Sequence, residues 1–231
     1  MKAICIIPAR SGSKRIPKKN IKLFFNKPII YYSIKTAIES NLFDKVIVST
    51  EDKNIANIAL AYGASVPFLR SIKNSSDRST TFDVIAEVIK KFNSEDYFFE
   101  YSCCLYPTAS LVTPNMLIEG FDKLINSKFD CVFPVIEYDH PIYRSFKLDS
   151  KGKLEFIFPE NLNKRTQDFQ KLFHDSGQFY WMRSKNVLEK NKLITDNSSG
   201  IIFSRNQIQD IDNIDDWKLA ELKYTLNKRN Y

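Results

Sequence analysis

The stretch ICIIPARSGSKRIPKKNIK, residues 4–22, joins an apolar run directly to six positive charges. The run from Ile4 to Ala9 has the length and composition of a buried strand. Lys and Arg side chains repel one another, so a cluster this dense needs either bulk water or an anion beside it. In open α/β sheets, ligands bind beyond the carboxyl ends of the strands. The stretch therefore predicts a strand that delivers a basic loop to an anion site.

The net charge of +7 originates in the N-terminal segment of the chain. Nine basic residues and no acidic residue precede Glu39, whereas the rest of the chain carries 25 Lys and Arg against 27 Asp and Glu. A protein that binds a nucleic-acid duplex usually draws positive charge from several elements, but one basic loop suits a compact polyphosphate. We therefore expect a small phosphorylated ligand and no nucleic-acid partner, with a basic RNA-binding protein as the less favoured alternative.

The length of 231 residues suits one domain with a full hydrophobic core, which we expect to span residues 1–231. No run approaches 18 consecutive apolar residues, so no membrane span is expected. The apolar run at 4–9 is too short for a signal peptide. Cys5, Cys103, Cys104 and Cys131 show no paired spacing. We expect them to be reduced core residues and the protein to be cytoplasmic.

Strand-like and helix-like segments alternate along the first 136 residues. Strands are predicted at 3–8, 45–50, 65–69, 99–106 and 131–136. Helices are predicted at 28–38, at 82–92, at 114–125, and in a segment that Thr50 caps and Gly63 ends. Strands separated by such helices indicate βαβ crossovers, so the predicted fold class is α/β with a mostly parallel, Rossmann-like sheet.

The alternation breaks after Glu137. Residues 144–158 have the pattern of a hairpin, strands are predicted at 174–182 and 200–204, and an amphipathic helix is predicted at 215–227. We expect residues 138–173 to leave the main sheet as a small β-rich excursion that acts as a lid or a dimer arm.

The basic loop after the first strand contains small residues, Ser11, Gly12 and Ser13, that allow close approach of the backbone to a ligand. It has neither the Walker P-loop pattern nor the dinucleotide-binding pattern of glycines. A solvated basic loop remains the alternative. The small residues beside the basic ones favour a polyphosphate site that differs from these two glycine-rich patterns.

The segment IPARSGSKRIPKKNI resembles the signature of the acylneuraminate cytidylyltransferases, which join CTP to nonulosonic acids. Four further segments resemble motifs of that family in the same order: VIVSTEDKNIANIALAYGA, VPFLR ending at Arg70, LYPTAS, and QDIDNIDDW. The segment SGQFYW is more similar to the pseudaminic acid cytidylyltransferases. The resemblance covers nearly the whole chain and implies a nucleotidyltransferase sheet with this substrate class.

The resemblance also implies roles for individual residues. The CTP-binding residues would be Ala9, Arg10, Ser11, Gly12, Ser13, Lys19, Asn20, Ser49 and Arg70. Those that bind the sugar acid would be Tyr106, Arg165, Gln178 and Tyr180. Asp210 and Asp212 would bind Mg²⁺, with Mn²⁺ as a substitute, and would be catalytic together with Arg10 and Lys19. Two carboxylates one residue apart in an extended chain project to one side, although they can also serve only to cap a loop.

The implied reaction is attack of the sugar's anomeric hydroxyl on the α-phosphorus of CTP, which yields a CMP-sugar and pyrophosphate for bacterial surface glycoconjugates or flagellin. The chain's two histidines, His140 and His174, lie in no matching catalytic motif, which argues against a Ser-His-Asp hydrolase. A sialic acid or legionaminic acid is the alternative substrate. A CMP-Kdo synthetase and a non-catalytic nucleotide-binding protein are less favoured. The family further implies a homodimer that exchanges the 138–173 segment.

Overall fold

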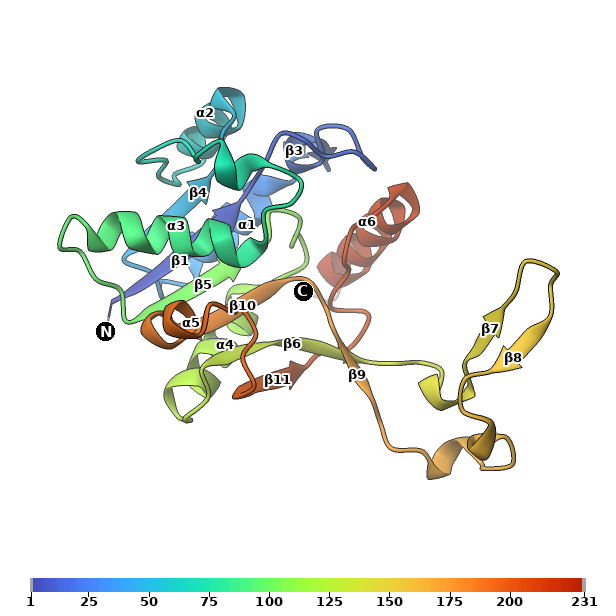
Figure 1. The fold of residues 1–231 in the computed structure, drawn as a ribbon. Coiled ribbons are helices and arrows are strands. Elements are labelled where there is room, and N and C mark those ends of the chain that lie inside the picture. Colours follow the sequence, from blue (N-terminus) through green and yellow to red (C-terminus); the bar gives the residue numbers. More distant parts are fainter. Residues whose placement is uncertain (1, 230–231) are drawn as a thin grey trace.

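The computed structural model describes residues 2–229 and is built around one twisted sheet (Figure 1). The strand order is β11-β6-β10-β5-β1-β4, and β9 pairs with β6 outside this path. The strands are β1 (Ala3–Pro8), β4 (Lys45–Ser49), β5 (Tyr101–Leu105), β6 (Cys131–Glu137), β9 (Phe173–Asp175), β10 (Phe179–Arg183) and β11 (Ser198–Ile202). The β4–β1–β5 and β6–β11 pairs are parallel, whereas β10 is antiparallel to both β5 and β6. The sheet is therefore mixed, with a parallel N-terminal half.

Helices cover both faces of this sheet. They are α1 (Ile30–Glu39), α2 (Lys53–Ala61), α3 (Thr81–Asn93), α4 (Pro114–Ile125), α5 (Ser184–Lys190) and α6 (Ile214–Arg229). Cys5 and Ile7 of β1 pack in the core that contains α1, α2 and α4. Ile4 and Ile6 face the opposite core, which contains α3 and α5. Because successive side chains of a strand point to opposite faces, β1 must be apolar at nearly every position, which explains the unbroken run seen in the sequence.

A third apolar cluster attaches α6 to the N-terminal half of the molecule. Phe24 lies in the short hairpin of β2 (Leu23–Phe24) and β3 (Lys27–Pro28), and its ring contacts Tyr32 of α1 and Trp217 of α6 edge to face. Trp217 and Ala220 are buried in this cluster. The contact matters for the site, because it places the segment that leads into α6 beside the loop that follows β1.

Three details of the sequence-based prediction are wrong. Residues 65–69 form no strand, and Ser65 makes only an isolated bridge to Ile47, because Pro67 lacks the N–H that a continuous ladder needs. The predicted strand 174–182 is divided into β9 and β10 by a turn at Gly177, whose φ is +62°. Asp52 rather than Thr50 caps α2, since its carboxylate accepts hydrogen bonds from the first-turn N–H groups. The helix α5 was not predicted.

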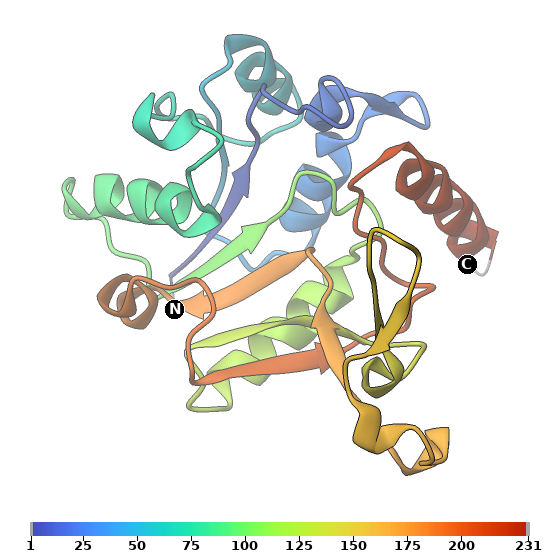
Figure 2. The same cartoon turned by 45° about the vertical axis from the view of Figure 1, so that its right-hand side comes forward.

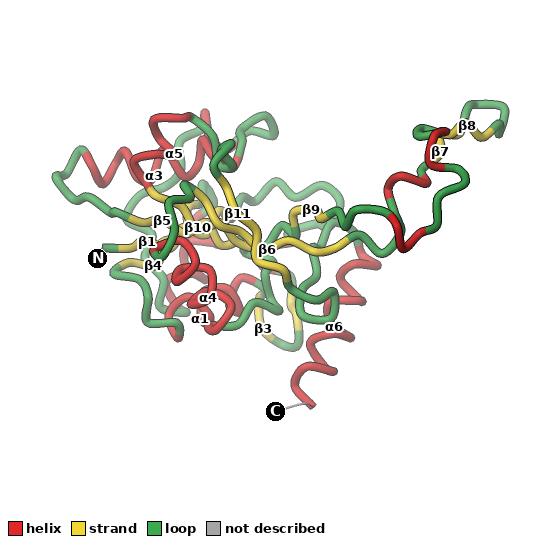
Figure 3. The backbone as a smooth tube through the Cα atoms, turned by 90° about the horizontal axis from the view of Figure 1, so that it is seen from below, coloured by secondary structure: helices red, strands yellow, loops and turns green. Residues whose placement is uncertain are grey.

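The predicted excursion leaves the sheet between β6 and β9 as residues 138–172, one residue shorter than predicted because Phe173 pairs with Glu137 in the sheet, and it projects from the body of the molecule (Figures 1, 2 and 3). We call it the arm. It carries the predicted hairpin as β7 (Phe146–Leu148) and β8 (Leu154–Phe156), together with the 3-10 turns η3 (Ile142–Arg144), η4 (Pro159–Asn161) and η5 (Thr166–Asp168). All six side chains of the β7–β8 hairpin are exposed, including Leu148 at 68% and Leu154 at 59%. None of the helices within residues 2–229 has the length and apolarity that crossing a membrane requires.

Candidate functional site

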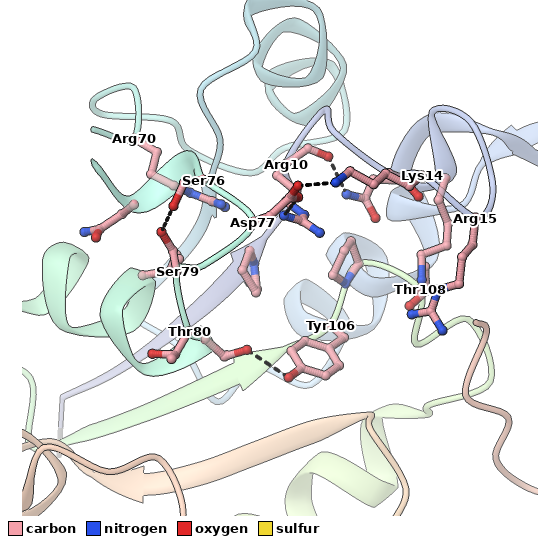
Figure 4. A pocket seen from close by; sticks show the side chains of 18 of the residues that line it. Arg10, Lys14, Arg15, Arg70, Ser76, Asp77, Ser79, Thr80, Tyr106 and Thr108 are labelled. Atoms are coloured by element: carbon pink, nitrogen blue, oxygen red, sulfur yellow. Dashed lines mark hydrogen bonds and ion pairs between the residues drawn. The ribbon is translucent and has the colours of Figure 1, made fainter. Parts of the chain in front are cut away.

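A cleft of about 620 Å³ opens at the carboxyl ends of β1 and β5 (Figure 4). Four segments that are far apart in the sequence form its walls. They are the basic loop after β1 (residues 10–20), the loop between Arg70 and α3 (residues 70–81), the residues that follow β5 (106–108), and the segment before α6 that contains Asp210 and Asp212. This is the edge at which open α/β sheets bind ligands.

The basic loop is held in place by contacts of its own and by one carboxylate. Asn20 is buried, and its Nδ2 donates a hydrogen bond to the carbonyl oxygen of Arg10 at 2.9 Å. The backbone N–H and the hydroxyl of Ser11 both donate to Glu51 Oε1, at 2.7 and 2.8 Å. Glu51 Oε2 is buried and has no hydrogen-bond partner within residues 2–229. Glu51 therefore fixes the position of Ser11, one of the small residues of the loop.

The cations of the cleft already contact internal oxygen atoms. Arg10 and Lys14 both contact Asp77, at 2.7 and 2.5 Å, and Arg15 contacts Asp212 at 2.7 Å. Five cations and several hydroxyl groups line the space between these segments, which makes the cleft suited to a ligand with more than one negative charge.

Two further cations are held by the backbone. Lys19 Nζ donates to the carbonyl oxygen of Ile211 at 2.6 Å. Burial lowers the pKa of Lys19, and the nearby carboxylates of Asp212 and Asp210 offset part of that effect. Arg70 is buried against β4, where its Nε donates to Ser49 Oγ at 3.0 Å and its guanidinium also contacts the Ser49 carbonyl oxygen.

Asp210 and Asp212 both line the cleft, as the alternation in the sequence predicted. Burial raises the pKa of Asp210, and the negative charge of Asp212 raises it further, so the two carboxylates are near enough to repel one another. Gly177 lies against Asp210, because a Cβ atom added to this glycine would be 3.0 Å from Asp210 Oδ2. The close approach therefore depends on the absence of a side chain at residue 177.

The two carboxylates of this pair suit Mg²⁺, which binds with few protein ligands. They suit less well a cation whose ligands all come from the protein. No group of three His, Cys, Asp or Glu side chains in the described part of the chain is arranged to hold a metal. Mg²⁺ usually keeps several waters and binds through one or two carboxylates together with substrate phosphates. Two adjacent carboxylates beside a cationic cleft meet that description.

Tyr106 is the one predicted sugar-binding residue that lines the cleft. Its hydroxyl lies 3.0 Å from Thr81 Oγ1, and burial raises its pKa to about 12. The buried ring of Tyr180 packs behind it with a centroid separation of 5.7 Å, and the Tyr180 hydroxyl donates to Asp175 Oδ2 at 2.5 Å. Gln178 is also buried, and its amide donates to backbone carbonyl oxygens, including that of Gln209 at 3.2 Å.

The structure thus divides the residues predicted from the sequence into two groups. Those that line the cleft are Arg10, Ser13, Lys19, Asn20, Arg70, Tyr106, Asp210 and Asp212. Those that do not line it are Ala9, Ser11, Gly12, Ser49, Arg165, Gln178 and Tyr180. Arg165 lies on the arm rather than in the cleft. Its exposed side chain contacts Asp168 at 3.1 Å.

Sequence reasoning missed the contribution of the loop 70–81. Asp77, Ser79, Thr80 and Thr81 line the cleft opposite the basic loop. Their signal in the sequence was a polar stretch, SIKNSSDRSTT, that follows Arg70 without strand or helix periodicity. A loop of that kind at the carboxyl edge of a sheet is a common place for binding residues, but its composition does not say which side chain turns inward.

The comparison with known proteins gives the same family as the motifs. A family model described as cytidylyltransferase matches residues 4–225. The chain is 38% identical over 227 residues to a pseudaminic acid cytidylyltransferase from Campylobacter jejuni, covering 98% of each chain. It is 31% identical over 237 residues to a CMP-N,N'-diacetyllegionaminic acid synthase from Legionella pneumophila, covering 99% of this chain and 98% of that protein.

A solved structure of a CMP:2-keto-3-deoxy-manno-octonic acid synthetase complexed with CTP has the same fold. Its TM-score is 0.71 with 16% sequence identity, and the match covers 99% of this chain and 100% of that one. The α/β sheet predicted from the sequence is thereby confirmed. Together with the family model and the relatives above, these findings show that the chain belongs to the cytidylyltransferase family.

Proposed function

We propose that this protein transfers a cytidylyl group from CTP to a nonulosonic acid, with pseudaminic acid as the substrate, and releases pyrophosphate. The observation that carries the proposal is the cleft itself, in which a cationic loop and an acidic pair face each other in a chain so similar to a pseudaminic acid cytidylyltransferase. The product would supply bacterial surface glycoconjugates or flagellin with an activated sugar.

The cleft has the means to hold two anions together. The reaction needs the anomeric hydroxyl of the sugar acid in line with the α-phosphorus of CTP, and it needs stabilisation of the charge that develops on pyrophosphate. Arg10, Lys14 and Lys19 line one wall and would bind the phosphates, while Arg70 lies deeper beside β4 and would contact the nucleoside. Tyr106, across the cleft, would contact the sugar.

We propose Mg²⁺, with Mn²⁺ as a substitute, as the cofactor held by Asp210 and Asp212. When bound, the ion would neutralise negative charge on the phosphates and polarise them. The support is the donor set described above and the repulsion within the pair, which a cation between the carboxylates would relieve.

A legionaminic acid is the second candidate substrate. The observation that favours it is the 31% identity over almost the whole of both chains with the Legionella synthase. A sialic acid substrate is supported by the motif resemblance and by 29–32% identity with N-acylneuraminate cytidylyltransferases. The side chains that distinguish these sugars would be those near Tyr106. The cationic loop would bind the phosphates of CTP, which all these reactions use.

We propose a homodimer in which two copies exchange their arms. Phe146, Leu148 and Leu154 leave apolar surface on the arm exposed, which is costly in water unless another surface covers it. Exchange would bring the partner subunit's Arg165 to the cleft, where its guanidinium would bind the sugar carboxylate. We also propose a cytoplasmic location, which the four buried free thiols support.

The proposed activity is tested by pyrophosphate release from CTP with a panel of nine-carbon sugar acids. We expect turnover with pseudaminic acid at a kcat/KM at least about tenfold above that for legionaminic or N-acetylneuraminic acid. Lys19→Ala should reduce turnover by at least about tenfold, because Lys19 lies among the groups that would bind the triphosphate. Absence of release with every sugar acid by folded wild-type protein would refute the proposed function.

Metal dependence is tested with Asp210→Asn and Asp212→Asn. Asparagine keeps the size of the side chain but removes its charge, so we expect losses of turnover above about tenfold without loss of thermal stability. High Mg²⁺ or Mn²⁺ should partly restore the activity of each variant. Wild-type turnover in excess chelator would remove the metal from the proposal and leave the two carboxylates as loop-capping groups.

Gly177→Ala tests the close packing on Asp210. Alanine at a positive φ strains the backbone by about 1 kcal/mol or more, and its Cβ would also displace the Asp210 carboxylate. Gly152→Ala is the matched control, because Gly152 has a φ of +83° and no neighbour within 4 Å of an added Cβ. We expect similar thermal shifts in both variants and a loss of turnover, about tenfold, only in Gly177→Ala. Equal turnover in both would show that the Asp210 position is not critical.

Arm exchange is tested by mixing two impaired variants, assayed at a sugar acid concentration at which each alone turns over slowly. Arg165→Ala should raise the KM for the sugar acid and leave CTP affinity unchanged, and Lys147→Ala on the same arm serves as the control for a lost positive charge. If Arg165 acts on the partner, a heterodimer of Arg165→Ala with Lys19→Ala contains one intact site and recovers activity. Recovery is absent if both residues act within one chain, and sedimentation would report whether the protein is a dimer at all.

A further inference from the structure

The loop between Arg70 and α3 is fastened at both ends and lines one side of the cleft (Figure 4). At its start, the N–H of Ser71 and the amide of Asn74 donate to the carboxylate of Glu87 on α3, at 2.9 and 2.6 Å. At its end, Thr80 and Asp83 form a reciprocal capping box at the N-terminus of α3. Residues 76–79 form the crest of the loop between these two anchors.

Asp77 on this crest contacts two cations of the basic loop. One carboxylate oxygen lies 2.7 Å from an Arg10 nitrogen, and the other lies 2.5 Å from Lys14 Nζ. The hydrogen bond and positive charge of Lys14 lower the pKa of Asp77, so the carboxylate is ionised at neutral pH. Its two oxygens therefore take the places on Arg10 and Lys14 that two oxygens of a phosphate group would take.

Arg15 also pairs with a carboxylate, that of Asp212 at 2.7 Å, whereas the two remaining cations of the cleft are held differently. Lys19 is bonded to a backbone carbonyl oxygen, and Arg70 is buried against β4. Neither contact has to break for a phosphate to bind nearby, because the oxygen atoms that Lys19 and Arg70 contact are uncharged. A phosphate that binds on the same side of Arg10 and Lys14 has to displace Asp77, since a carboxylate and a phosphate in one place repel each other.

We propose that Asp77 is an internal competitor for the phosphate-binding cations, which sets the affinity for CTP and for pyrophosphate and assists the release of pyrophosphate. A polyphosphate displaces it, because exposed ion pairs are individually weak and a ligand with several charges makes more of them. When pyrophosphate begins to leave, Asp77 returns to Arg10 and Lys14 and hinders its rebinding.

The expected effect on affinity follows from the population of the open loop. If phosphate binds only when Asp77 has left, the apparent dissociation constant is the intrinsic one divided by the open fraction. A ligand whose phosphate does not reach Arg10 and Lys14 avoids this cost. Removal of the Asp77 charge should therefore tighten the binding of CTP and pyrophosphate but leave that of CMP unchanged.

The experiment is calorimetric titration of wild type and Asp77→Asn with pyrophosphate, CTP and CMP. We expect about three- to tenfold tighter binding of pyrophosphate and CTP by the variant, no change for CMP, and a smaller difference at high salt. Asp196→Asn is the matched control. It removes the same charge from an exposed ion pair, with Lys192 at 3.9 Å, and it lies outside the cleft. In a Lys14→Ala background, the gain from Asp77→Asn should shrink.

Equal or weaker binding of pyrophosphate by Asp77→Asn, with Asp196→Asn behaving as wild type, would overturn the proposal. Weaker binding would identify Asp77 as a group that assists the ligand, for example through a bound cation. The identity of the ligands rests on the proposed function, but the titration with pyrophosphate needs no sugar acid. A protein that binds pyrophosphate as expected and turns over no nonulosonic acid would refute the proposed function alone.

Discussion

The concentration of positive charge at the carboxyl end of β1 is the constraint on which the rest of the site depends. Six cations within residues 10–22 destabilise the loop unless anions lie beside them. The fold supplies carboxylates from three distant segments, namely Glu51 after β4, Asp77 in the loop before α3, and Asp212 before α6. Asp77 and Asp212 form ion pairs with Arg10, Lys14 and Arg15, whereas Glu51 accepts hydrogen bonds from Ser11. The charge of the loop is therefore partly balanced within the protein itself.

The geometry of the acidic pair depends on the mixed character of the sheet. Strand β10 is antiparallel to its two neighbours, so the turn at Gly177 that precedes it lies at the same edge as the carboxyl ends of the parallel strands. That turn lies against Asp210, and the amide of Gln178 donates to the carbonyl oxygen of Gln209. The acidic segment is consequently supported by the same turn that positions Tyr180 behind Tyr106.

The attachment of α6 completes this arrangement. Trp217 packs on Phe24 of the β2–β3 hairpin, which directly follows the basic loop. Lys19 also bonds to the carbonyl oxygen of Ile211, which lies between the two aspartates. An apolar cluster, the Lys19 hydrogen bond and the Arg15–Asp212 ion pair thus hold the basic and acidic segments together. The arm takes no part in these contacts, and its exposed apolar surface is available for contacts outside the chain.

The sequence by itself determined the features that depend on local order. The apolar run of β1, the alternation of strands and helices, the departure of the arm after Glu137 and the clustering of charge all follow from periodicity and composition over short windows. The motif resemblance added candidate residues, and eight of them line the cleft.

Only the tertiary structure decided which of these groups meet. Arg10 and Asp77 are 67 residues apart, and Lys19 and Ile211 are 192 apart, so no local pattern pairs them. The extended segment 65–69 and the split of 174–182 likewise depended on Pro67 and on the positive φ of Gly177 in their packed surroundings. Periodicity reports which face of an element is buried, whereas the position of a side chain in a cleft depends on how several elements pack together.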